Sequence, residues 1–536
     1  MSWHLSVTAS KMFDFDSNCR LLKDPVHGYV RVPCSLFDKF IDTERFQRLR
    51  SIEQTSMRWL FPGGRHDRFI HSIGVFHLAH LTYDALLRNV SDVEVQQALR
   101  SNALQETFLV ASLMHDCGHA PFSHTFEDYY NAYCDECEHN EAYDALNGIL
   151  GADTRTDMVA HEQSADSPAP HEAMSAYVLL RYYHEAMKGC GIVDCDLAAR
   201  MITGCRHSSA TTVQLQVENE LIGLLNGFVI DVDKLDYIIR DTWASGVQNF
   251  SIDVPRLVAG ATLVRPNGGR VTFAYRQMSL GVVQTVIDAR NHLYEWIYGH
   301  HTVLYYSEVL RRAVKQLGVE LSNLSNADVL QDNPREILRR MFSVAMFERP
   351  VALITGMPRP SVSLLSDGDV LFLLKTFCKG DPWRLSYCEH QPKHFALWKT
   401  AAEYRMLIHK DRQYRISQGD CVVAVRAKFG FSEDECFACK DMSHKLSQIK
   451  ENSVMIEMRP GVIRSLRTVA NLPSYQEPPR DVENPAFYLY LPNSFRNRRD
   501  EVIEFINGLD KSSIMAGFVP RPSAAGRPVR SVDVNS

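Results

Sequence analysis

Apolar residues recur every three or four positions over two long stretches of the chain, which is the pattern of amphipathic helices. Over 70–87 the apolar stripe consists of Ile73, Phe76, Ala79, Tyr83 and Leu87. Over 103–116 it consists of Leu104, Phe108, Ala111 and His115. We expect Gly118 to end the second helix, because glycine is favoured just beyond helix C-termini. The pattern therefore predicts a helical core in the N-terminal half.

The segment 131–170 departs from this pattern. It holds nine acidic residues against one basic residue, Arg155, and it ends in a Ser-Pro-Ala-Pro run. This composition is typical of a solvated loop, so we expect an insertion between two helices. Helical periodicity resumes at His171. Strands are predicted at Val271–Ala274, Ser361–Leu365 and Phe487–Leu491.

These elements predict a mainly α fold with a helical core and a smaller, mixed α/β C-terminal lobe. The composition changes near residue 345, beyond which proline clusters separate helix and strand signals. We expect a flexible leader at 1–19, the core at 20–345, the C-terminal lobe at 346–510 and a disordered tail at 511–536.

Composition excludes several classes of protein. Of the 536 residues, 45% are hydrophobic and 23% are charged, which is typical of a globular chain. No apolar run approaches the roughly 20 residues that cross a bilayer, so we expect no membrane association. A net charge of −6 does not favour nucleic acid as the main partner. The 13 cysteines form no dense framework, so we expect an intracellular protein of the cytoplasm or nucleus rather than the mitochondrion.

One run contains an adjacent histidine and aspartate, His115 and Asp116, followed by His119 and His124. A neutral imidazole and a carboxylate side by side can bind a single divalent ion. His115 continues the apolar stripe of its helix, so it should face the interior. Taken alone, such a pair is more often a hydrogen-bonded helix end than a pair of metal ligands.

Two further segments supply polar groups of the same kind. His71 stands at the start of the first predicted helix, and Gly74 lies on the same face one turn later. A small residue there leaves room for a ligand or for a closely packed helix. The segment 230–241 has polar residues at 233, 237 and 241 opposite an apolar stripe, so one face packs and the other faces a site.

His71, the His115–Asp116 pair and Asp233 together resemble the H…HD…D signature of the HD superfamily of metal-dependent phosphohydrolases. Two histidines and two carboxylates favour a divalent metal such as Fe, Mn, Zn or Mg. The chain is most similar to the deoxynucleoside triphosphate triphosphohydrolase branch, and within it to vertebrate members that also carry a SAM domain. We expect no SAM domain in the twenty residues before the core. The similarity covers about residues 20–310 and runs in order through Lys23–Tyr29, Asp42–Arg50, Phe61–Gly63 and Arg68–His71.

The resemblance implies a set of metal ligands and a set of substrate contacts. The metal ligands would be His71, His115, Asp116 and Asp233. The substrate contacts would be Gln54, Arg68, Lys234, Tyr237, Asp241, Arg290 and Tyr298. The three cationic residues would bind phosphate, and the others would surround the deoxyribose, with Tyr298 crowding the 2′ position. The alternative for Tyr237 and Tyr298 is that they are core aromatics with a bonded hydroxyl.

The implied reaction is attack of water on the α-phosphorus of a dNTP, which releases a deoxynucleoside and triphosphate. His124 would protonate the 5′ oxygen, because histidine can hold a proton near neutral pH. Glu127 would orient His124, and His119 would contact phosphate oxygens.

A further catalytic histidine is expected in a His-Glu pair, and the sequence offers two. His161 is followed closely by Ser167-Pro168, which cannot continue a helix. His171 opens a long amphipathic stretch and is therefore our choice.

The resemblance also implies an activator site for GTP or dGTP between subunits of a homodimer or homotetramer. An aspartate can accept hydrogen bonds from the N1–H and N2–H₂ groups of guanine. The expected activator contacts are Arg20, Lys23, Asp42, Gln47, Arg50 and Arg276. Met278 and His301 replace lysines of a second activator pocket, so the use of that pocket stays open. The alternative for Asp42 and Arg50 is a surface ion pair on one helix.

The expected function is therefore a metal-dependent dNTP triphosphohydrolase activated by a guanine nucleotide. One alternative is an HD phosphohydrolase that acts on another nucleotide, which would need neither the 42–50 block nor the Lys234, Tyr237 and Arg290 set. The other is a catalytically silent protein that binds nucleotides or nucleic acid. The complete metal set and the acidic net charge argue against that alternative.

Overall fold

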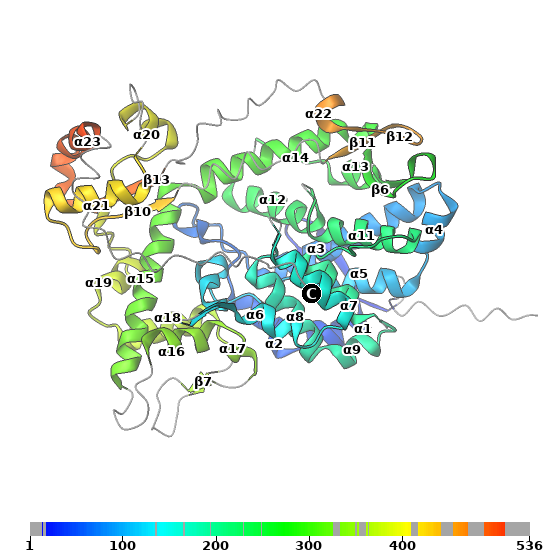
Figure 1. Ribbon diagram of the computed structural model, residues 1–536, viewed down its shortest axis with the longest axis horizontal. Coiled ribbons are helices and arrows are strands. Elements are labelled where there is room, and N and C mark those ends of the chain that lie inside the picture. The colour runs from blue at the N-terminus through cyan, green and yellow to red at the C-terminus, as the bar shows by residue number, and fades with distance from the viewer. Residues whose placement is uncertain are drawn as a thin grey trace, which may run out of the picture. The chain divides into compact units, whose positions relative to one another are not determined.

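The computed structural model describes residues 13, 15, 18–134, 137–164, 167–192, 194–228, 230–247, 249–324, 333–348, 351–352, 361–362, 364–408, 416–440, 454–469 and 487–509 (Figure 1). The expected leader 1–19 lies almost entirely outside these residues, and the expected tail 511–536 lies entirely outside them. The chain divides into two compact units, 1–391 with 442–478 and 392–441 with 479–536. The composition change near residue 345 therefore lies within the first unit.

The first unit is mainly helical, as predicted. Its α-helices are α1 (Cys34–Leu36), α2 (Glu44–Gln47), α3 (Arg68–Asn89), α4 (Val93–Leu99), α5 (Asn102–Met114), α6 (Glu141–Asn147), α7 (Ala152–Glu162), α8 (Pro170–Tyr182), α9 (His184–Lys188), α10 (Cys195–Thr203), α11 (Val213–Leu225), α12 (Val232–Ser245), α13 (Val254–Ala259), α14 (Leu280–His292), α15 (His301–Leu324), α16 (Pro334–Phe342), α17 (Ala345–Glu348), α18 (Asp367–Phe377), α19 (Pro382–Cys388) and α22 (Leu466–Val469). Its 3₁₀ and π-helical segments are η1 (Phe37–Ile41), η2 (Arg48–Ser51), η3 (Ser56–Trp59), η4 (Ser123–Tyr130), η5 (Pro266–Gly268), η6 (Gln277–Ser279) and η7 (Leu293–Tyr298).

The strands of the first unit form small sheets. They are β1 (Cys19–Asp24), β2 (Gly28–Pro33), β3 (Asn131–Cys134), β4 (Cys137–Asn140), β5 (Ala261–Val264), β6 (Thr272–Arg276), β7 (Val351–Ala352), β8 (Ser361–Val362), β11 (Met455–Arg459) and β12 (Val462–Ser465). The largest sheet has the order β12-β11-β6-β5, with β6 parallel to β11 and antiparallel to β5. The hairpins β1–β2, β3–β4 and β7–β8 are antiparallel.

Helix α3 is the central element of the first unit, and it packs against both α5 and α12 (Figure 1). Its buried side chains include Ile73, Phe76, Ala79 and Tyr83, which were predicted to form the apolar stripe. Burying a stripe of this kind is the main favourable term in folding such a helix. The packing brings together the ends of three helices that carry the predicted metal ligands.

The prediction of a solvated loop at 131–170 is wrong. This segment forms the hairpin β3–β4 and the helices α6 and α7, and α6 packs against α8. Buried apolar residues hold it to the core: Tyr143, Leu146, Leu150 and Met158. The acidic residues described on these helices are half-buried or exposed, so the composition hides an amphipathic pattern: Glu141, Asp144, Asp153, Asp157 and Glu162.

Gly118 does not end the second predicted helix, because α5 already ends at Met114. A Cβ atom on Gly118 would lie 2.4 Å from the backbone nitrogen of Ser175 in α8. The amide of Gly118 also donates a hydrogen bond of 2.9 Å to Ser175 Oγ. Glycine is therefore required here for the close approach of the loop to α8.

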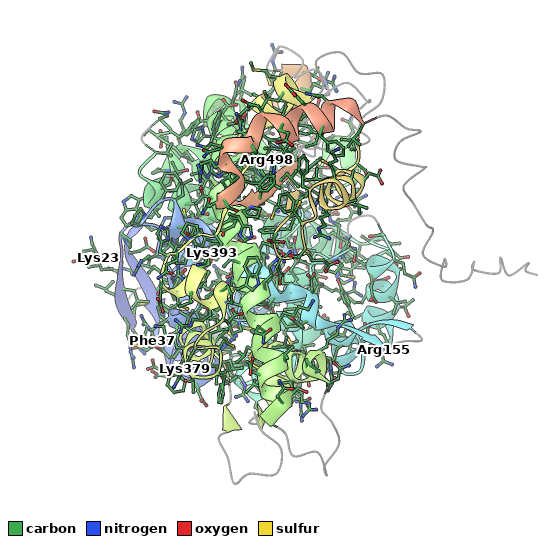
Figure 2. The ribbon with its side chains drawn as sticks, turned by 90° about the vertical axis from the view of Figure 1, so that its left-hand side faces the viewer. Lys23, Phe37, Arg155, Lys379, Lys393 and Arg498 are labelled. Atoms are coloured by element: carbon green, nitrogen blue, oxygen red, sulfur yellow. The ribbon has the colours of Figure 1, made fainter. Side chains whose placement is uncertain are left out.

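The second unit is a small mixed α/β body. Its elements are β9 (His394–Ala396), β10 (Phe437–Lys440), β13 (Phe487–Pro492), α20 (Ala401–Ile408), α21 (Gln418–Phe429), η10 (Asn493–Arg498) and α23 (Arg499–Gly508). The sheet order is β10-β13-β9, and the central strand β13 is buried along almost its whole length. A continuous apolar run is the expected signature of such a strand. Figure 2 marks Arg498 at the start of α23.

Candidate active site

Helix caps place the four predicted metal ligands. Asp67 accepts the amide of Ile70 and starts α3, which puts His71 in the first turn. Asp231 accepts the amide of Lys234 and starts α12, which puts Asp233 in its first turn. His115 and Asp116 follow the last turn of α5. Aspartate is a strong N-cap residue because its carboxylate satisfies amides that lack a partner within the helix.

The donor atoms of these four residues converge. His71 Nε2 lies 3.1 Å from Asp233 Oδ1, 3.3 Å from His115 Nε2 and 3.5 Å from Asp116 Oδ2. His115 Nε2 lies 3.6 Å from both carboxylates. Ligands about 2.1 Å from a common ion lie roughly 3.0 to 3.4 Å apart, depending on the geometry. The donor atoms of His71, His115 and Asp233 therefore form a group that could hold a metal ion, and Asp116 Oδ2 lies beside both imidazoles.

The partners of the two imidazoles leave the converging nitrogens free to bind a metal. His71 Nδ1 lies 2.7 Å from Asp236 Oδ2, and His115 Nδ1 lies 2.9 Å from the backbone oxygen of Ser112. An Nδ1–H that donates to each of these oxygens leaves the lone pair on Nε2. Histidines that bind metals commonly have such an oxygen partner on the other nitrogen.

The electrostatics of this group also favour a cation. Burial alone would lower the pKa of His71, but its contacts with Asp233 and Asp236 outweigh burial and raise that pKa to about 10. Burial alone would raise the pKa of Asp233, but His115 and His71 hold it below its usual range. The carboxylates thus stay ionised and stabilise positive charge between the imidazoles, whether it is a proton or a metal ion.

A second cluster consists of the predicted catalytic residues. Glu127 Oε1 lies 2.7 Å from Nδ1 of both His124 and His171. The rings of His119 and His171 stack with their centroids 4.1 Å apart. His119 Nε2 lies 3.3 Å from Asp116 Oδ1, so it connects this cluster to the metal ligands. The side chain of His124 is 63% exposed, whereas that of His119 is fully buried.

Two neighbouring imidazoles of the second cluster, His119 and His171, differ in charge. Burial, Arg68 and His171 lower the pKa of His119 well below its usual range, so His119 is neutral. Burial opposes a charge on His171 as well, but Glu127 outweighs it and raises the pKa of His171 to about 9. The cluster therefore holds a cationic imidazole next to a neutral one near pH 7.

The structure distinguishes between the two His-Glu pairs. His171, at the start of α8, is the one that meets Glu127. His161 lies on α7, and its Nε2 is 3.1 Å from the backbone oxygen of Thr203. The contact between η4 and α8 brings His171 to the second cluster.

Several predicted substrate residues have buried polar atoms without a hydrogen-bond partner among the described residues. These atoms are Gln54 Oε1, Arg68 Nη2, and Nε and Nη1 of Arg290. Arg68 also donates to Ser123 Oγ at 2.7 Å and to Asp116 Oδ2 at 2.5 Å, which fixes its guanidinium beside the metal ligands. Because an unpaired buried polar group is costly, such atoms commonly mark positions that a ligand completes.

The other predicted substrate residues interact mainly with protein groups. Tyr298 donates to Asp241 Oδ2, and Asp241 Oδ1 lies 2.6 Å from His66 Nε2. Tyr298 lies in the π-helical segment η7, a distortion that is frequent at functional sites. Lys234 is half-buried and forms an ion pair with Asp231, whose carboxylate outweighs the effect of burial and raises the pKa of the ammonium group. Burial raises the pKa of Tyr237 well above its usual value. Tyr294 and Arg290 lie close enough to affect this pKa as well.

Sequence reasoning missed several residues that support the site: His66, Ser112, Asp236, Arg48 and Asp367. Asp367 accepts the amide of Phe122 at 2.6 Å and that of Glu53 at 3.0 Å. Arg48 donates to the backbone oxygens of His119 and Leu365. Arg48 lies within the 42–50 stretch and Asp236 within the 230–241 segment that the sequence analysis singled out, but neither was given a role there. His66, Ser112 and Asp367 were not singled out at all.

The predicted activator residues lie on two parts of the first unit. Arg20 forms ion pairs with Asp42 at 3.0 Å and with Asp38 at 2.9 Å, and Arg50 donates to Gln47 at 2.8 Å. Asp42 thus pairs with Arg20 rather than with Arg50. Lys23 is exposed at the outer edge of the β1–β2 hairpin (Figure 2).

Arg276 is the activator residue that lies apart from the others. It is on β6, where it donates two hydrogen bonds to Asn89, at 3.0 Å and 2.8 Å. Within one chain, no described contact joins Arg276 to the hairpin residues.

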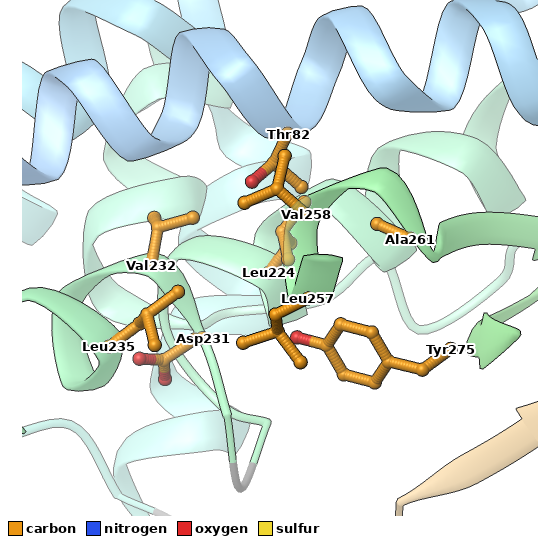
Figure 3. Close-up of a pocket in the computed structure, with 9 residues that line it drawn as sticks. All are labelled: Thr82, Leu224, Asp231, Val232, Leu235, Leu257, Val258, Ala261 and Tyr275. Atoms are coloured by element: carbon orange, nitrogen blue, oxygen red, sulfur yellow. The ribbon is translucent and has the colours of Figure 1, made fainter. Parts of the chain in front are cut away.

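A small pocket lies behind the first turn of α12 and is separate from the metal ligands (Figure 3). Its lining residues are Thr82, Leu224, Asp231, Val232, Leu235, Leu257, Val258, Ala261 and Tyr275. The lining is mostly apolar and includes none of the predicted site residues.

Among the described helices, none is both long and apolar enough to cross a membrane.

Comparisons with known proteins find several relatives of this chain. No family model matches the chain. The chain is 28% identical over 282 residues to an uncharacterized protein, YwfO, of Bacillus subtilis, and the match covers 52% of each chain. It is 29% identical over 291 residues to the deoxynucleoside triphosphate triphosphohydrolase SAMHD1 of Gallus gallus, with 52% of this chain and 42% of that protein covered. The chain thus spans about half the length of the curated relatives it matches.

A solved structure supports the fold. A phosphohydrolase from Bacteroides thetaiotaomicron superposes with a TM-score of 0.56 at 17% identity, covering 88% of this chain and 99% of that one. The mainly α fold with small mixed sheets predicted from the sequence is therefore confirmed. By sequence, the chain is similar to the HD-domain deoxynucleoside triphosphate triphosphohydrolases, as its motifs indicated.

Proposed function

We propose that this protein is a metal-dependent dNTP triphosphohydrolase that converts a dNTP and water into a deoxynucleoside and triphosphate. The observation that carries the proposal is the adjacency of two clusters, one able to bind a metal and one able to transfer protons. His119 connects them, because it contacts Asp116 and stacks on His171. A bound metal ion and a proton-transfer group at one phosphorus atom can together promote hydrolysis of a phosphate ester.

The metal site would be formed by His71, His115, Asp116 and Asp233. When bound there, a divalent ion supplies a lowered pKa for a bound water and stabilises charge that develops on phosphate oxygens. Arg68 and Arg290 bind the triphosphate, because their unpaired N–H groups suit phosphate oxygens. Gln54, Lys234, Tyr237 and Asp241 complete the substrate contacts.

Proton transfer is assigned to the residues around Glu127. Its carboxylate stays ionised because His124 and His171 outweigh the effect of burial on its pKa. Glu127 orients His124, which donates a proton to the 5′ oxygen as the deoxynucleoside leaves. The cationic His171 stabilises the negative charge of the phosphates, and His119 contributes hydrogen bonds.

We further propose that GTP or dGTP activates the enzyme. The guanine would be read by Asp42, Gln47 and Arg50, and Arg20 and Lys23 supply positive charge for its phosphates. Arg276 would come from another subunit of a homodimer or homotetramer. Sedimentation with and without GTP tests this assembly, since activation through a shared site requires a larger species.

The metal assignment is tested with Asp233→Ala and a matched control, Asp196→Ala. Both aspartates occupy the second position of a helix, in α12 and α10, so both changes remove an acidic group from a first turn. We expect Asp233→Ala to lose bound metal, measured by mass spectrometry of the elements, and to lose dNTP hydrolysis. Asp196→Ala should keep both. Retention of metal and turnover by Asp233→Ala would contradict the proposal.

A further inference from the structure

Asp236 is a buried carboxylate that holds the metal ligand His71. Its Oδ2 lies 2.7 Å from His71 Nδ1, and both side chains are almost fully buried. This contact fixes the imidazole ring and directs its Nε2 toward the other three ligands. The position of His71 is therefore only as well defined as the position of Asp236.

Arg240 holds Asp236 from the same helix. Its Nε donates to Asp236 Oδ2 at 2.8 Å, and its Nη2 donates to Oδ1 at 2.9 Å. Both side chains are completely buried. A paired buried arginine and carboxylate with two hydrogen bonds have a narrowly defined geometry.

Gly74 in α3 provides the space for this ion pair. A Cβ atom at this position would lie 1.9 Å from Asp236 Oδ1 and 2.4 Å from Arg240 Nη2. Any side chain there would displace the pair. The small residue noted in the sequence therefore makes room for a carboxylate–guanidinium pair rather than for a ligand.

The turn between β1 and β2 also holds Asp236. Arg240 Nη2 lies 2.9 Å from Asp24 Oδ2, and His27 Nε2 lies 2.6 Å from Asp236 Oδ1. Asp24 Oδ1 accepts the amides of Val26 and His27 at 2.6 Å and 2.9 Å, which shapes the turn that presents His27. The contacts thus form a closed ring through Asp24, Arg240, Asp236 and His27.

We propose that the β1–β2 turn is a working part of the metal centre, in which Asp24 and His27 are positioning residues that hold Asp236 and thereby orient His71. This inference rests on the proposed metal site. It adds residues about 45 positions upstream of the first ligand to the group that determines metal affinity. Loss of residues that orient a metal ligand typically weakens binding by about 10- to 100-fold.

The test compares Asp24→Asn with Asp157→Asn in the full chain after removal of metal. Asp157 Oδ2 is also 2.9 Å from an arginine, Arg200, that is almost fully buried, but the pair joins α7 to α10 rather than to a metal ligand. Manganese affinity is measured from the electron paramagnetic resonance signal of free Mn²⁺. We expect Asp24→Asn to raise the dissociation constant about 10- to 100-fold and Asp157→Asn to leave it within about twofold.

A second pair of variants gives the answer if Asp24→Asn does not fold. Gly74→Ala should weaken Mn²⁺ binding because its methyl group displaces Asp236, whereas Gly281→Ala should not. Gly281 lies at the start of α14 with no atom within 4 Å of a Cβ there. Both changes replace a helical glycine, so a difference between them reports on the Asp236 pair.

The outcomes separate this inference from the metal site itself. Wild-type Mn²⁺ affinity in Asp24→Asn or Gly74→Ala would overturn the role of the turn, provided that His71→Ala loses binding. An equal loss of Mn²⁺ affinity in Asp157→Asn would also overturn the role of the turn, because breaking any buried ion pair would then weaken metal binding. Wild-type affinity in His71→Ala would instead overturn the proposed metal site.

Discussion

At the scale of single residues, the chemistry of the site depends on which atom of each side chain is already occupied. His115 uses Nδ1 for the backbone of Ser112, so its Nε2 remains for a metal. Arg68 uses Nε and Nη1 for Ser123 and Asp116, so its Nη2 remains for a phosphate. The atoms that have no protein partner therefore indicate what each side chain could bind, as much as the residue type does.

The ion pair of Glu127 with His171 predicts a pH-dependent contribution to stability. The pKa of His171 is raised from 6.5 in the unfolded chain to about 9, so the native state binds its proton more tightly. The stabilisation is complete below pH 6.5 and is lost as the pH rises through about 9. It is also lost in acid, where Glu127 becomes protonated.

Urea unfolding of the wild type and of His171→Gln tests this prediction. We expect the difference in unfolding free energy between them to be larger at pH 6 than at pH 9.5. A difference that is constant or larger at pH 9.5 would show that the pair is not the source of the raised pKa.

We predict that the ring of Tyr298 makes the proposed reaction selective for deoxyribose over ribose. Its ring would occupy the space of a 2′-hydroxyl, and its own hydroxyl bonds Asp241. Tyr298→Ala should lower the preference for dGTP over GTP, measured as the ratio of kcat/KM values, by about tenfold or more. Tyr298→Phe keeps the ring and should keep the preference. If both variants discriminate as well as the wild type, the ring does not exclude the 2′-hydroxyl.

At the scale of elements, the segment that begins α18 supports the loop that carries His119 and His124, for which we propose roles in proton transfer and phosphate binding. Phe122 and Ser123, just before His124, have φ of 59° and 53°, which non-glycine residues rarely adopt. Such residues cost about 1–3 kcal/mol each and persist only when their surroundings hold them. Asp367 does so through its hydrogen bond to the Phe122 amide.

We therefore expect Asp367→Asn to lower activity, because it would displace the loop at Phe122 and Ser123. The amide group cannot accept both backbone N–H groups, so the Phe122–His124 segment should shift, and kcat should fall by up to about 100-fold. Asp369→Asn is the control, because Asp369 lies on the same helix but bonds only Ser366 at its N-terminus. Equal effects of the two changes would assign the loss to α18 stability rather than to the loop.

Element boundaries show where sequence reasoning succeeded and where it failed. Helix α3 was predictable because its apolar stripe has the helical period, and strand β13 because it is a short, continuous apolar run between prolines. Segment 131–170 was not, because its acidic surface outweighs the few apolar residues that bury α6 and α7. A composition average cannot separate the two faces of one helix.

At the scale of the whole molecule, the predicted donors come from segments far apart in the chain. His71, His115 and Asp233 were predictable because each stands at a helix end within a recognisable motif. Their supports, Asp236 and Ser112, were not, because their roles arise only when α3, α5 and α12 pack together. The sequence therefore predicts the groups that bind and react better than those that position them.

The proposed activation by GTP also concerns the whole molecule. Arg50 lies over the ring of Phe69 at 3.5 Å and donates to Gln47, beside the start of α3. Arg50→Ala should abolish activation by GTP but leave the metal content unchanged, as measured by initial rates with and without GTP. A variant that still responds fully to GTP would place the activator elsewhere.

The central claim is that this chain cleaves the bond between the α-phosphorus and the 5′ oxygen of a dNTP. The most direct measurement is ³¹P nuclear magnetic resonance of a reaction with dGTP and Mg²⁺, after which the nucleosides are separated by chromatography. We expect inorganic triphosphate and an equal amount of deoxyguanosine, formed by the wild type and not by Asp233→Ala. Pyrophosphate with deoxyguanosine monophosphate, or no product from metal-loaded protein, would contradict it.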